Sequence, residues 1–231
     1  MASIEANLQQ VRQRIARACH ESGRPAQSVT LLAVGKTFEA TALRQAHAAG
    51  QRDFGENYVQ EALAKIDALA DLRADLRWHL IGPLQSNKTR VVAEHFDWVH
   101  SVDRLKIAQR LAEQRPAALP PLQLCLQVNI SGEASKSGLL PQEVAAVAQA
   151  VSELPPQRVR LRGLMAVPEP ADTFTAQREP HHALRELLAG LNEGGLALDT
   201  LSMGMSADLE AAVAEGATMV RIGTAIFGTR G

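Results

Sequence analysis

This 231-residue chain has little cysteine, no long apolar run and no excess of charge of one sign. Cys19 and Cys125 are the only cysteines and lie far apart, which argues against a disulfide framework and against a thiolate metal site. No stretch approaches the roughly 20 apolar residues that span a bilayer, and the amphipathic N-terminus lacks the apolar core of a secretion signal. Because 24 Lys and Arg balance 25 Asp and Glu, no basic field attracts nucleic acid or an anionic membrane. We therefore expect a cytoplasmic protein, with no nucleic acid and no membrane among its partners.

The apolar residues are arranged as one helix followed by a regular alternation. Ile4, Leu8, Val11, Ile15 and Ala18 recur at the helical period within residues 1–24. Short apolar runs, each typical of a buried strand, follow at 30–35, 52–55, 78–82, 98–102, 123–130, 161–167, 200–204 and 219–223. Helical patterns separate these runs at 40–49, 58–69, 87–95, 103–114, 141–153, 176–191 and 206–215.

Strict alternation of strands and helices implies a parallel sheet. The eight strand-like runs favour a closed (β/α)₈ barrel, because an open doubly wound sheet of this length usually has fewer strands. The first strand-to-helix turn, AVGKTFEA, also lacks the GxGxxG dinucleotide fingerprint. The sequence therefore predicts an α/β fold: one domain over 1–231, with a TIM barrel over 28–231 and an extra N-terminal helix over 1–24.

Polar side chains gather at the carboxyl ends of the predicted strands, where barrels of this type carry their function. Lys36 directly follows the apolar run LLAVG, which places a long amine just above the barrel core. Such an amine is suited to attack a carbonyl carbon and form a Schiff base. Position alone favours a lysine that reaches out of the barrel rim into water, and the other strand ends reverse that preference.

The loops after the seventh and eighth strands are the usual phosphate site of this fold, and here they read GMSADLE and RIGTAIFG. Ser206 offers a hydroxyl and is expected to open the helix over 206–215, whose N–H groups would point at an anion. Gly223 permits close approach of the backbone, and Thr224 adds a second hydroxyl. The alternative is that Ser206 only caps its helix and Gly223 only makes a turn. We favour the phosphate site because both loops carry suitable residues.

Arg221 lies two positions before Gly223, so on a strand it points to the same side, into the barrel mouth. A buried arginine needs an acceptor, either a carboxylate such as Glu56 or the ring nitrogen of a cofactor. General considerations favour the carboxylate. His79 fits a packed, hydrogen-bonded histidine as well as a site residue, and no spacing of the HExxH or CxxC type predicts a metal site.

Taken together, several segments closely resemble the pyridoxal phosphate homeostasis protein family (YggS/PROSC), whose barrel is similar to the N-terminal domain of alanine racemase. The segments are AVGKT at 33–37, FGENYVQE at 54–61, WHLIGPLQSNK at 78–88, VNISGEASKSG at 128–138, RGLMAVPEP at 162–170, and LSMGMSADLEAAVAEGATMVRIGTAIFGTR at 201–230. Among the few departures, Gly35 stands where a serine is expected.

The resemblance implies that pyridoxal 5′-phosphate is the cofactor and that Lys36 holds it as a Schiff base. Ser206, Gly223 and Thr224 would hold its phosphate, and Arg221 would face the pyridine nitrogen. Other residues would line the pocket: Asn57, His79, Met165, Ser202 and Met205. Lys136 occupies the position of a second family lysine that is linked to handling of the cofactor.

Two functions are compatible with this site. A carrier would store, buffer or deliver the cofactor inside the cell, with enzymes that lack their pyridoxal phosphate as possible partners. An amino-acid racemase would instead need an acid/base group on each face of the bound substrate, and Lys36 can serve only one face. The only tyrosine, Tyr58, starts a predicted helix and is expected to pack against the barrel. We therefore favour a non-catalytic carrier and keep an aldolase acting through Lys36 as a third option. We expect a monomer because the second domain of alanine racemase has no counterpart here.

Overall fold

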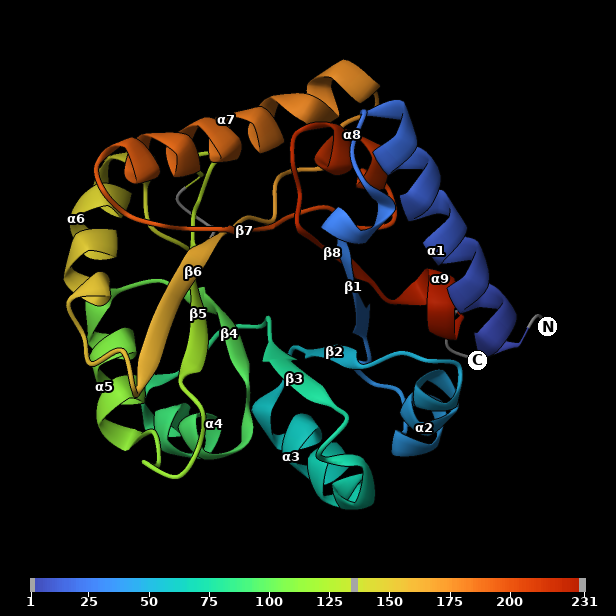
Figure 1. The fold of residues 1–231 in the computed structure, drawn as a ribbon, viewed down its shortest axis with the longest axis horizontal. Coiled ribbons are helices and arrows are strands. Elements are labelled where there is room, and N and C mark those ends of the chain that lie inside the picture. The colour runs from blue at the N-terminus through green and yellow to red at the C-terminus, as the bar shows by residue number, and fades with distance from the viewer. Residues whose placement is uncertain (1–2, 134–136, 229–231) are drawn as a thin grey trace.

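A closed barrel of eight parallel strands, which follow one another in chain order, forms the centre of the protein (Figure 1). The structure is a computed structural model that describes residues 3–133 and 137–228. The strands are β1 Thr30–Val34, β2 Asp53–Glu56, β3 Arg77–Leu80, β4 Trp98–Val102, β5 Leu122–Gln127, β6 Val159–Met165, β7 Thr200–Ser202 and β8 Met219–Ile222. The last strand closes on the first, with Thr30 opposite Met219 and Ala33 opposite Ile222. The predicted TIM barrel is thereby confirmed.

Helices surround the barrel (Figure 1). They are α1 Ile4–Glu21, α2 Ala40–Ala48, α3 Val59–Ala68, α4 Thr89–His95, α5 Leu105–Gln114, α6 Pro141–Ser152, α7 Phe174–Glu193, α8 Leu209–Ala214 and α9 Thr224–Phe227, with short 3₁₀ helices η1 Ala26–Ser28, η2 Ala70–Leu72 and η3 Ser86–Lys88. The helix predicted over 206–215 begins only at Leu209, and α9 is not among the predicted helices. Of the helices in the described part of the chain, none has an apolar stretch long enough to cross a membrane.

The main apolar core lies between the barrel and its helices. The helix α5 illustrates the pattern, since Ile107, Ala108, Leu111 and Ala112 recur on one face and are all buried. Phe54 of β2 is fully buried in the same core. Large apolar side chains such as Phe54 and Leu111 each contribute about 1.5–3 kcal/mol when they leave water, so this layer fixes the barrel geometry.

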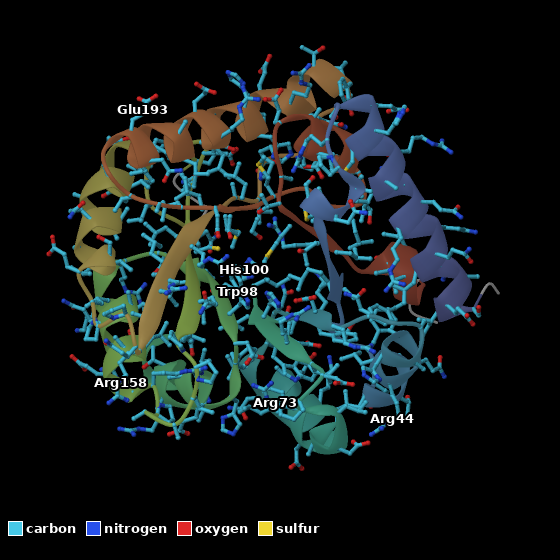
Figure 2. The ribbon with its side chains drawn as sticks, in the orientation of Figure 1. Arg44, Arg73, Trp98, His100, Arg158 and Glu193 are labelled. Carbon is cyan, nitrogen blue, oxygen red and sulfur yellow. The ribbon has the colours of Figure 1, made fainter. Side chains whose placement is uncertain are left out.

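The inside of the barrel holds polar side chains as well as apolar ones. A small apolar cluster, separate from the main core, consists of Trp98, Cys125, Met165 and Met219. Figure 2 shows Trp98 and His100 within the ring of strands, and their ring centroids are 5.7 Å apart. The pairing of β4 with β5 shifts register between Val99 and Val102. Irregularities of this kind re-aim side chains, and His100 lies in the shifted stretch.

The N-terminal helix α1 covers the last two helices of the chain. Figure 1 shows α1 beside α8 and α9, and residue contacts join all three. The guanidinium of Arg14 donates to the carboxylate of Glu210 in α8 at 2.6 Å. The side-chain amide of Asn7 donates to the carbonyl of Ile226 in α9 at 2.9 Å. The helix α1 therefore supports the two segments that follow β7 and β8.

Candidate functional site

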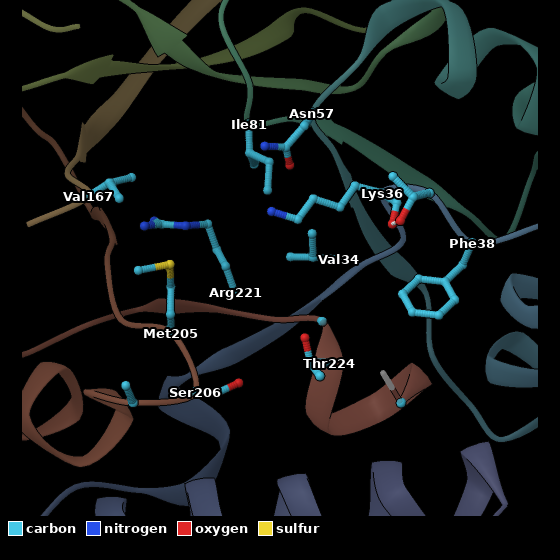
Figure 3. Close-up of a pocket in the computed structure, with 14 residues that line it drawn as sticks. Val34, Lys36, Phe38, Asn57, Ile81, Val167, Met205, Ser206, Arg221 and Thr224 are labelled. Atoms are coloured by element: carbon cyan, nitrogen blue, oxygen red, sulfur yellow. Dashed lines mark hydrogen bonds between the residues drawn. The ribbon is translucent and has the colours of Figure 1, made fainter. Parts of the chain in front are cut away.

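A cavity of about 640 Å³ opens at the carboxyl ends of the strands (Figure 3). Its wall is formed by residues that follow β1, β2, β3, β6, β7 and β8, together with Val34 and Arg221 from the strands themselves. Seven residues predicted for the site line it: Lys36, Asn57, Met205, Ser206, Arg221, Gly223 and Thr224. The remaining lining residues are Val34, Thr37, Phe38, Ile81, Val167, Ala207 and Gly228.

Lys36 lies in a tight turn directly after β1. The N–H of Phe38 donates to the carbonyl of Gly35 at 3.0 Å, which closes a four-residue turn with Lys36 and Thr37 at its centre. Thr37 has φ 68°, a left-handed conformation that costs a β-branched residue roughly 1–2 kcal/mol. The Lys36 side chain is exposed and its amine points into the cavity (Figure 3). Lys36 therefore lies just above the core, as expected, but in a cavity wall that is open to water.

A buried ion pair lies beneath this turn. The ammonium of Lys65, in α3, donates to both carboxylate oxygens of Glu56 at 2.8 and 3.0 Å and to the carbonyl of Gly35 at 2.6 Å. Glu56 is fully buried, and burial raises its pKa to about 7 even though Lys65 acts in the opposite direction. A Cβ atom at Gly35 would lie 2.7 Å from Glu56 Oε1, so the serine expected here would need a shift of the Glu56 side chain. Glu56 and Lys65 thus hold the backbone that carries Lys36.

The loops after β7 and β8 face Lys36 from another wall of the cavity. Figure 3 shows the hydroxyl groups of Ser206 and Thr224 directed into the cavity. Within the described residues, neither hydroxyl has a hydrogen-bond partner, and no backbone carbonyl accepts from the N–H groups of Ser206, Ala207, Thr224 or Ala225. Four free N–H donors and two free hydroxyls on adjoining loops are suited to bind an anion.

The expectation that Ser206 opens a helix is wrong. The first residue of α8 is Leu209 and its N-cap is Asp208, whose carboxylate accepts the N–H of Met205 at 2.7 Å. The second oxygen of Asp208 contacts His181 Nε2 at 2.9 Å. Because Asp208 fixes the loop, the Ser206 hydroxyl is not used for capping and stays directed at the cavity.

Arg221 reaches from β8 across the floor of the cavity. One terminal nitrogen donates to the carbonyl of Ser202 at 2.6 Å and to its hydroxyl at 2.9 Å, and the other donates to the carbonyl of Ala166 at 2.8 Å. The expectation that a carboxylate such as Glu56 pairs with Arg221 is therefore wrong, because Glu56 pairs with Lys65 instead. Burial without a bound carboxylate lowers the pKa of Arg221 to about 10, so the side chain keeps its charge at neutral pH.

Three residues expected to line the pocket lie beneath its wall. His79 and Ser202 are fully buried and Met165 is 1% exposed. Met165 belongs to the apolar cluster around Trp98. Ser202 is held by Arg221, and His79 contacts another histidine, His100. These side chains form the layer under the cavity, while Lys136 lies outside the described residues.

Sequence reasoning missed three residues connected to the site: Lys65, Asp53 and His100. Lys65 lies in a predicted helix, where a lysine is expected to be exposed to solvent, and only the fold shows that it reaches under Gly35. His100 could have been noticed, because it is a histidine in the middle of an apolar run, two positions after Trp98 and so on the same side of a strand. Tyr58, expected to pack against the barrel, is instead 56% exposed and does not line the cavity.

The residues present fit an aldehyde-bearing aromatic phosphate. The side-chain oxygen of Asn57 is buried in the wall without a hydrogen-bond partner, which a bound polar group would supply. Lys36 offers an amine, the two loops offer donors for a dianion, and Arg221 offers a cation at the floor. Val34, Ile81 and Val167 provide apolar surface between these polar groups.

Comparison with known proteins gives a consistent result. The family model of the alanine racemase N-terminal domain matches residues 1–231. The chain is 64% identical over 230 residues to a pyridoxal phosphate homeostasis protein of Pseudomonas aeruginosa, covering 100% of this chain and 97% of that one. It is 55% identical over 231 residues to the protein of the same name in Escherichia coli K12, covering 100% and 98%.

Among solved structures, PipY of Synechococcus elongatus PCC7942 with PLP bound superimposes with a TM-score of 0.85. The two chains share 41% identity, and the match covers 98% of this chain and 100% of that one. The resemblance inferred from the sequence motifs is thereby confirmed. The chain belongs to the alanine racemase N-terminal domain family and, within it, to the pyridoxal phosphate homeostasis proteins.

Proposed function

We propose that this protein binds pyridoxal 5′-phosphate as a reversible Schiff base on Lys36, and that it stores, buffers or delivers the cofactor without catalysing a reaction. The observation that carries the proposal is a cavity whose described lining residues provide one amine, a set of unused anion donors on a neighbouring wall, and no second acid/base group. The full-length relatives named for pyridoxal phosphate homeostasis support it, as does the related PipY structure with PLP bound.

Each part of the cavity has a distinct task in this proposal. The amine of Lys36 condenses with the aldehyde carbon, so that a C=N bond forms and water leaves, and hydrolysis reverses the step. Ser206, Thr224 and the N–H groups of their loops bind the phosphate. Gly223 allows the close approach of that loop, and Arg221 faces the pyridine nitrogen. A cation at this nitrogen keeps it unprotonated, which makes the ring a weak electron sink.

The absence of a second base favours carriage over catalysis. Among the described residues that line the cavity there is no carboxylate, histidine, tyrosine or cysteine. A racemase acting on both faces of a substrate needs a proton donor opposite Lys36, and geometry is the first requirement for such a group. We therefore propose that substrate racemisation and aldol cleavage are not functions of this site.

The wider setting follows from the same proposal. We place the protein in the cytoplasm, where its buried free thiols Cys19 and Cys125 stay reduced. Enzymes that need pyridoxal phosphate are its proposed recipients, and we propose that it acts as a monomer in one domain. Lys136 is proposed to assist in handling the cofactor.

Borohydride trapping tests the assignment of Lys36. The purified protein is incubated with pyridoxal phosphate, its absorption spectrum is recorded, and sodium borohydride is added. We expect a yellow protein that bleaches on reduction, with the reduced cofactor attached to the peptide that contains Lys36. The control variant Lys88→Arg changes a lysine of η3 that does not line the cavity, and it should label as the unmodified protein does. Lys36→Arg should not label. A protein that stays colourless, or that labels on another lysine, contradicts the proposal.

Deuterium exchange tests the absence of catalysis. The loaded protein is incubated with L-alanine in deuterated water, and exchange of the α-proton and formation of D-alanine are followed. We expect no exchange above that given by free pyridoxal phosphate. Rapid exchange with racemisation would establish the racemase instead.

A further inference from the structure

An uninterrupted chain of buried hydrogen bonds crosses the inside of the barrel from the cavity to the opposite end. Arg221 donates to the hydroxyl of Ser202 at 2.9 Å, and this hydroxyl lies 2.8 Å from His100 Nδ1. His100 Nε2 lies 2.9 Å from His79 Nδ1, and His79 Nε2 lies 3.1 Å from Asp53 Oδ1. The residues come from β8, β7, β4, β3 and β2. Asp53 is the first residue of its strand, so the chain ends away from the cavity.

The two ends of the chain have fixed roles, which limit the directions of the bonds between them. The guanidinium of Arg221 can only donate, and an ionised carboxylate can only accept. Burial opposes ionisation of Asp53, but hydrogen bonds from Arg77 and His79 outweigh it and hold the pKa of this carboxyl well below its usual range. The carboxylate therefore accepts from His79.

The two imidazoles between these ends are then assigned as well. Burial above all, with the guanidinium of Arg221 acting in the same direction, holds the pKa of His100 well below its ordinary value, so this ring is neutral. If Ser202 donates to His100 Nδ1, then His100 Nε2–H donates to His79 Nδ1, and His79 Nε2–H donates to Asp53. In this arrangement each donor meets one acceptor. The reverse tautomer of His100 would leave the Ser202 hydroxyl proton without an acceptor in the chain.

The chain compensates for the missing carboxylate next to Arg221. Asp53 is 7% exposed and Arg221 is 4% exposed, while the three residues between them are fully buried. Aligned hydrogen bonds in a medium of low dielectric constant polarise one another, so the Ser202 oxygen becomes a better acceptor for the guanidinium. The His79 ring stacks on Trp98, with ring centroids 5.5 Å apart, which holds the orientation of the His79 imidazole.

We propose that Asp53, His79 and His100 are positioning residues that act through Ser202 to hold Arg221 at the floor of the cavity, where it meets the ring of the bound cofactor. The inference rests on the proposed function for the identity of that cofactor. The orientation of Arg221 is then determined in part by a carboxylate at the far end of the barrel.

The hydrogen-bond directions can be tested in the protein without added cofactor. Ring nitrogens of ¹⁵N-histidine-labelled protein are observed by long-range ¹H–¹⁵N correlation at neutral pH, with His79→Gln and His100→Gln used for assignment. We expect both rings to be neutral with the proton on Nε2. A proton on Nδ1 of His100, or a charged His79 ring, overturns the proposal.

Asp53→Asn tests the coupling along the chain, with Asp97→Asn as its matched control. Asp97 also lies at the amino end of the barrel and also pairs with an arginine, Arg73, at 2.8 Å, but it belongs to no histidine chain. We expect Asp53→Asn to change the ring shifts of His100, because an amide is not confined to accepting. Asp97→Asn should leave them unchanged. Unchanged His100 shifts in Asp53→Asn overturn the proposal.

Cofactor binding gives the second readout. We expect Asp53→Asn and His100→Gln to weaken binding of pyridoxal phosphate about tenfold and to shift its absorption band, as loss of an orienting partner commonly does. Asp97→Asn should bind within about twofold of the unmodified protein. If Asp53→Asn does not fold, the cofactor affinity of His100→Gln tests the inference. Unchanged affinity and spectrum in both variants overturn this inference and leave the proposed function standing. If the unmodified protein does not bind pyridoxal phosphate, the proposed function is overturned, and the histidine spectra still test the hydrogen-bond chain.

Discussion

Removal of Lys65 gives the sharpest test of how the Lys36 turn is held. In Lys65→Met the carboxylate of Glu56 stays fully buried but loses its two contacts at 2.8 and 3.0 Å, and the carbonyl of Gly35 loses its contact at 2.6 Å. Leaving one partner of a buried ion pair uncompensated costs about 3–5 kcal/mol of unfolding free energy. For a chain of this length such a loss lowers the melting temperature by about 10 °C.

The pH dependence of the loss identifies its cause. Burial raises the pKa of Glu56 to about 7, above its value of about 4.3 in an unfolded chain, so the folded protein binds the proton more strongly. The unfolding free energy therefore increases as the pH falls through the window between these two values. Without Lys65 the pKa of Glu56 rises further. The difference between Lys65→Met and the unmodified protein should then shrink as the pH is lowered from about 8 to about 5.

Thermal and denaturant unfolding at several pH values measures both effects. Lys106→Met, which changes an exposed lysine of α5, is the control and should stay within about 0.5 kcal/mol of the unmodified protein. The double variant Glu56→Gln/Lys65→Met should recover part of the loss, since no buried charge remains. A melting temperature for Lys65→Met equal to that of the control, or a loss independent of pH, would refute the reasoning.

Four further outcomes follow from the backbone and from one buried thiol. In a denaturant titration, Gly204→Ala should lower the unfolding free energy by about 2–4 kcal/mol, because the φ of Gly204 is 93° and a Cβ atom there would lie 2.5 Å from the Cβ of Ala212. Gly190→Ala should instead raise the unfolding free energy by up to about 1 kcal/mol, because Gly190 lies inside α7 and the added atom has nothing within 4 Å. Thr37→Asn should raise the unfolding free energy by about 1 kcal/mol and so slightly raise the melting temperature, since asparagine tolerates the left-handed conformation better than a β-branched residue. The thiol of Cys125, whose pKa burial raises to about 12, should stay unreactive toward a disulfide reagent at pH 8 and react only on unfolding, and rapid reaction in the native state would contradict the structure.

Local pattern was sufficient to predict the barrel, because each strand and each longer helix carries its own periodicity. The apolar run that predicts β1 is uninterrupted, and the run that predicts β8 is interrupted only by Arg221. Lys36 and Arg221 therefore come to one mouth as soon as the barrel is closed. The helix at 206–215 was placed too early because Ser206 is as good an N-cap residue as Asp208. Only the fold shows that the Asp208 carboxylate accepts the N–H of Met205.

The interactions that hold the site could not be predicted in the same way. Lys65 reaches Glu56 and Gly35 from the next helix, and a helical pattern does not say which lysine turns inward. His79 was identified as a candidate, but its partners come from β2 and β4 and are set by the register between strands. Pairwise distances of this kind depend on closure of the barrel, to which every strand contributes.

The position of α1 gives the cavity a connection to the outer surface of the protein. Its contacts reach both α8, which directly follows the loop that carries Ser206, and α9, which begins at Thr224. The side chains of Arg14 and Asn7 attach to one of these helices each, so the two loops share a common brace. A displacement of either loop on loading or release must be absorbed by this brace. Amide hydrogen exchange along α1 would therefore report the filling of a cavity that α1 itself does not line.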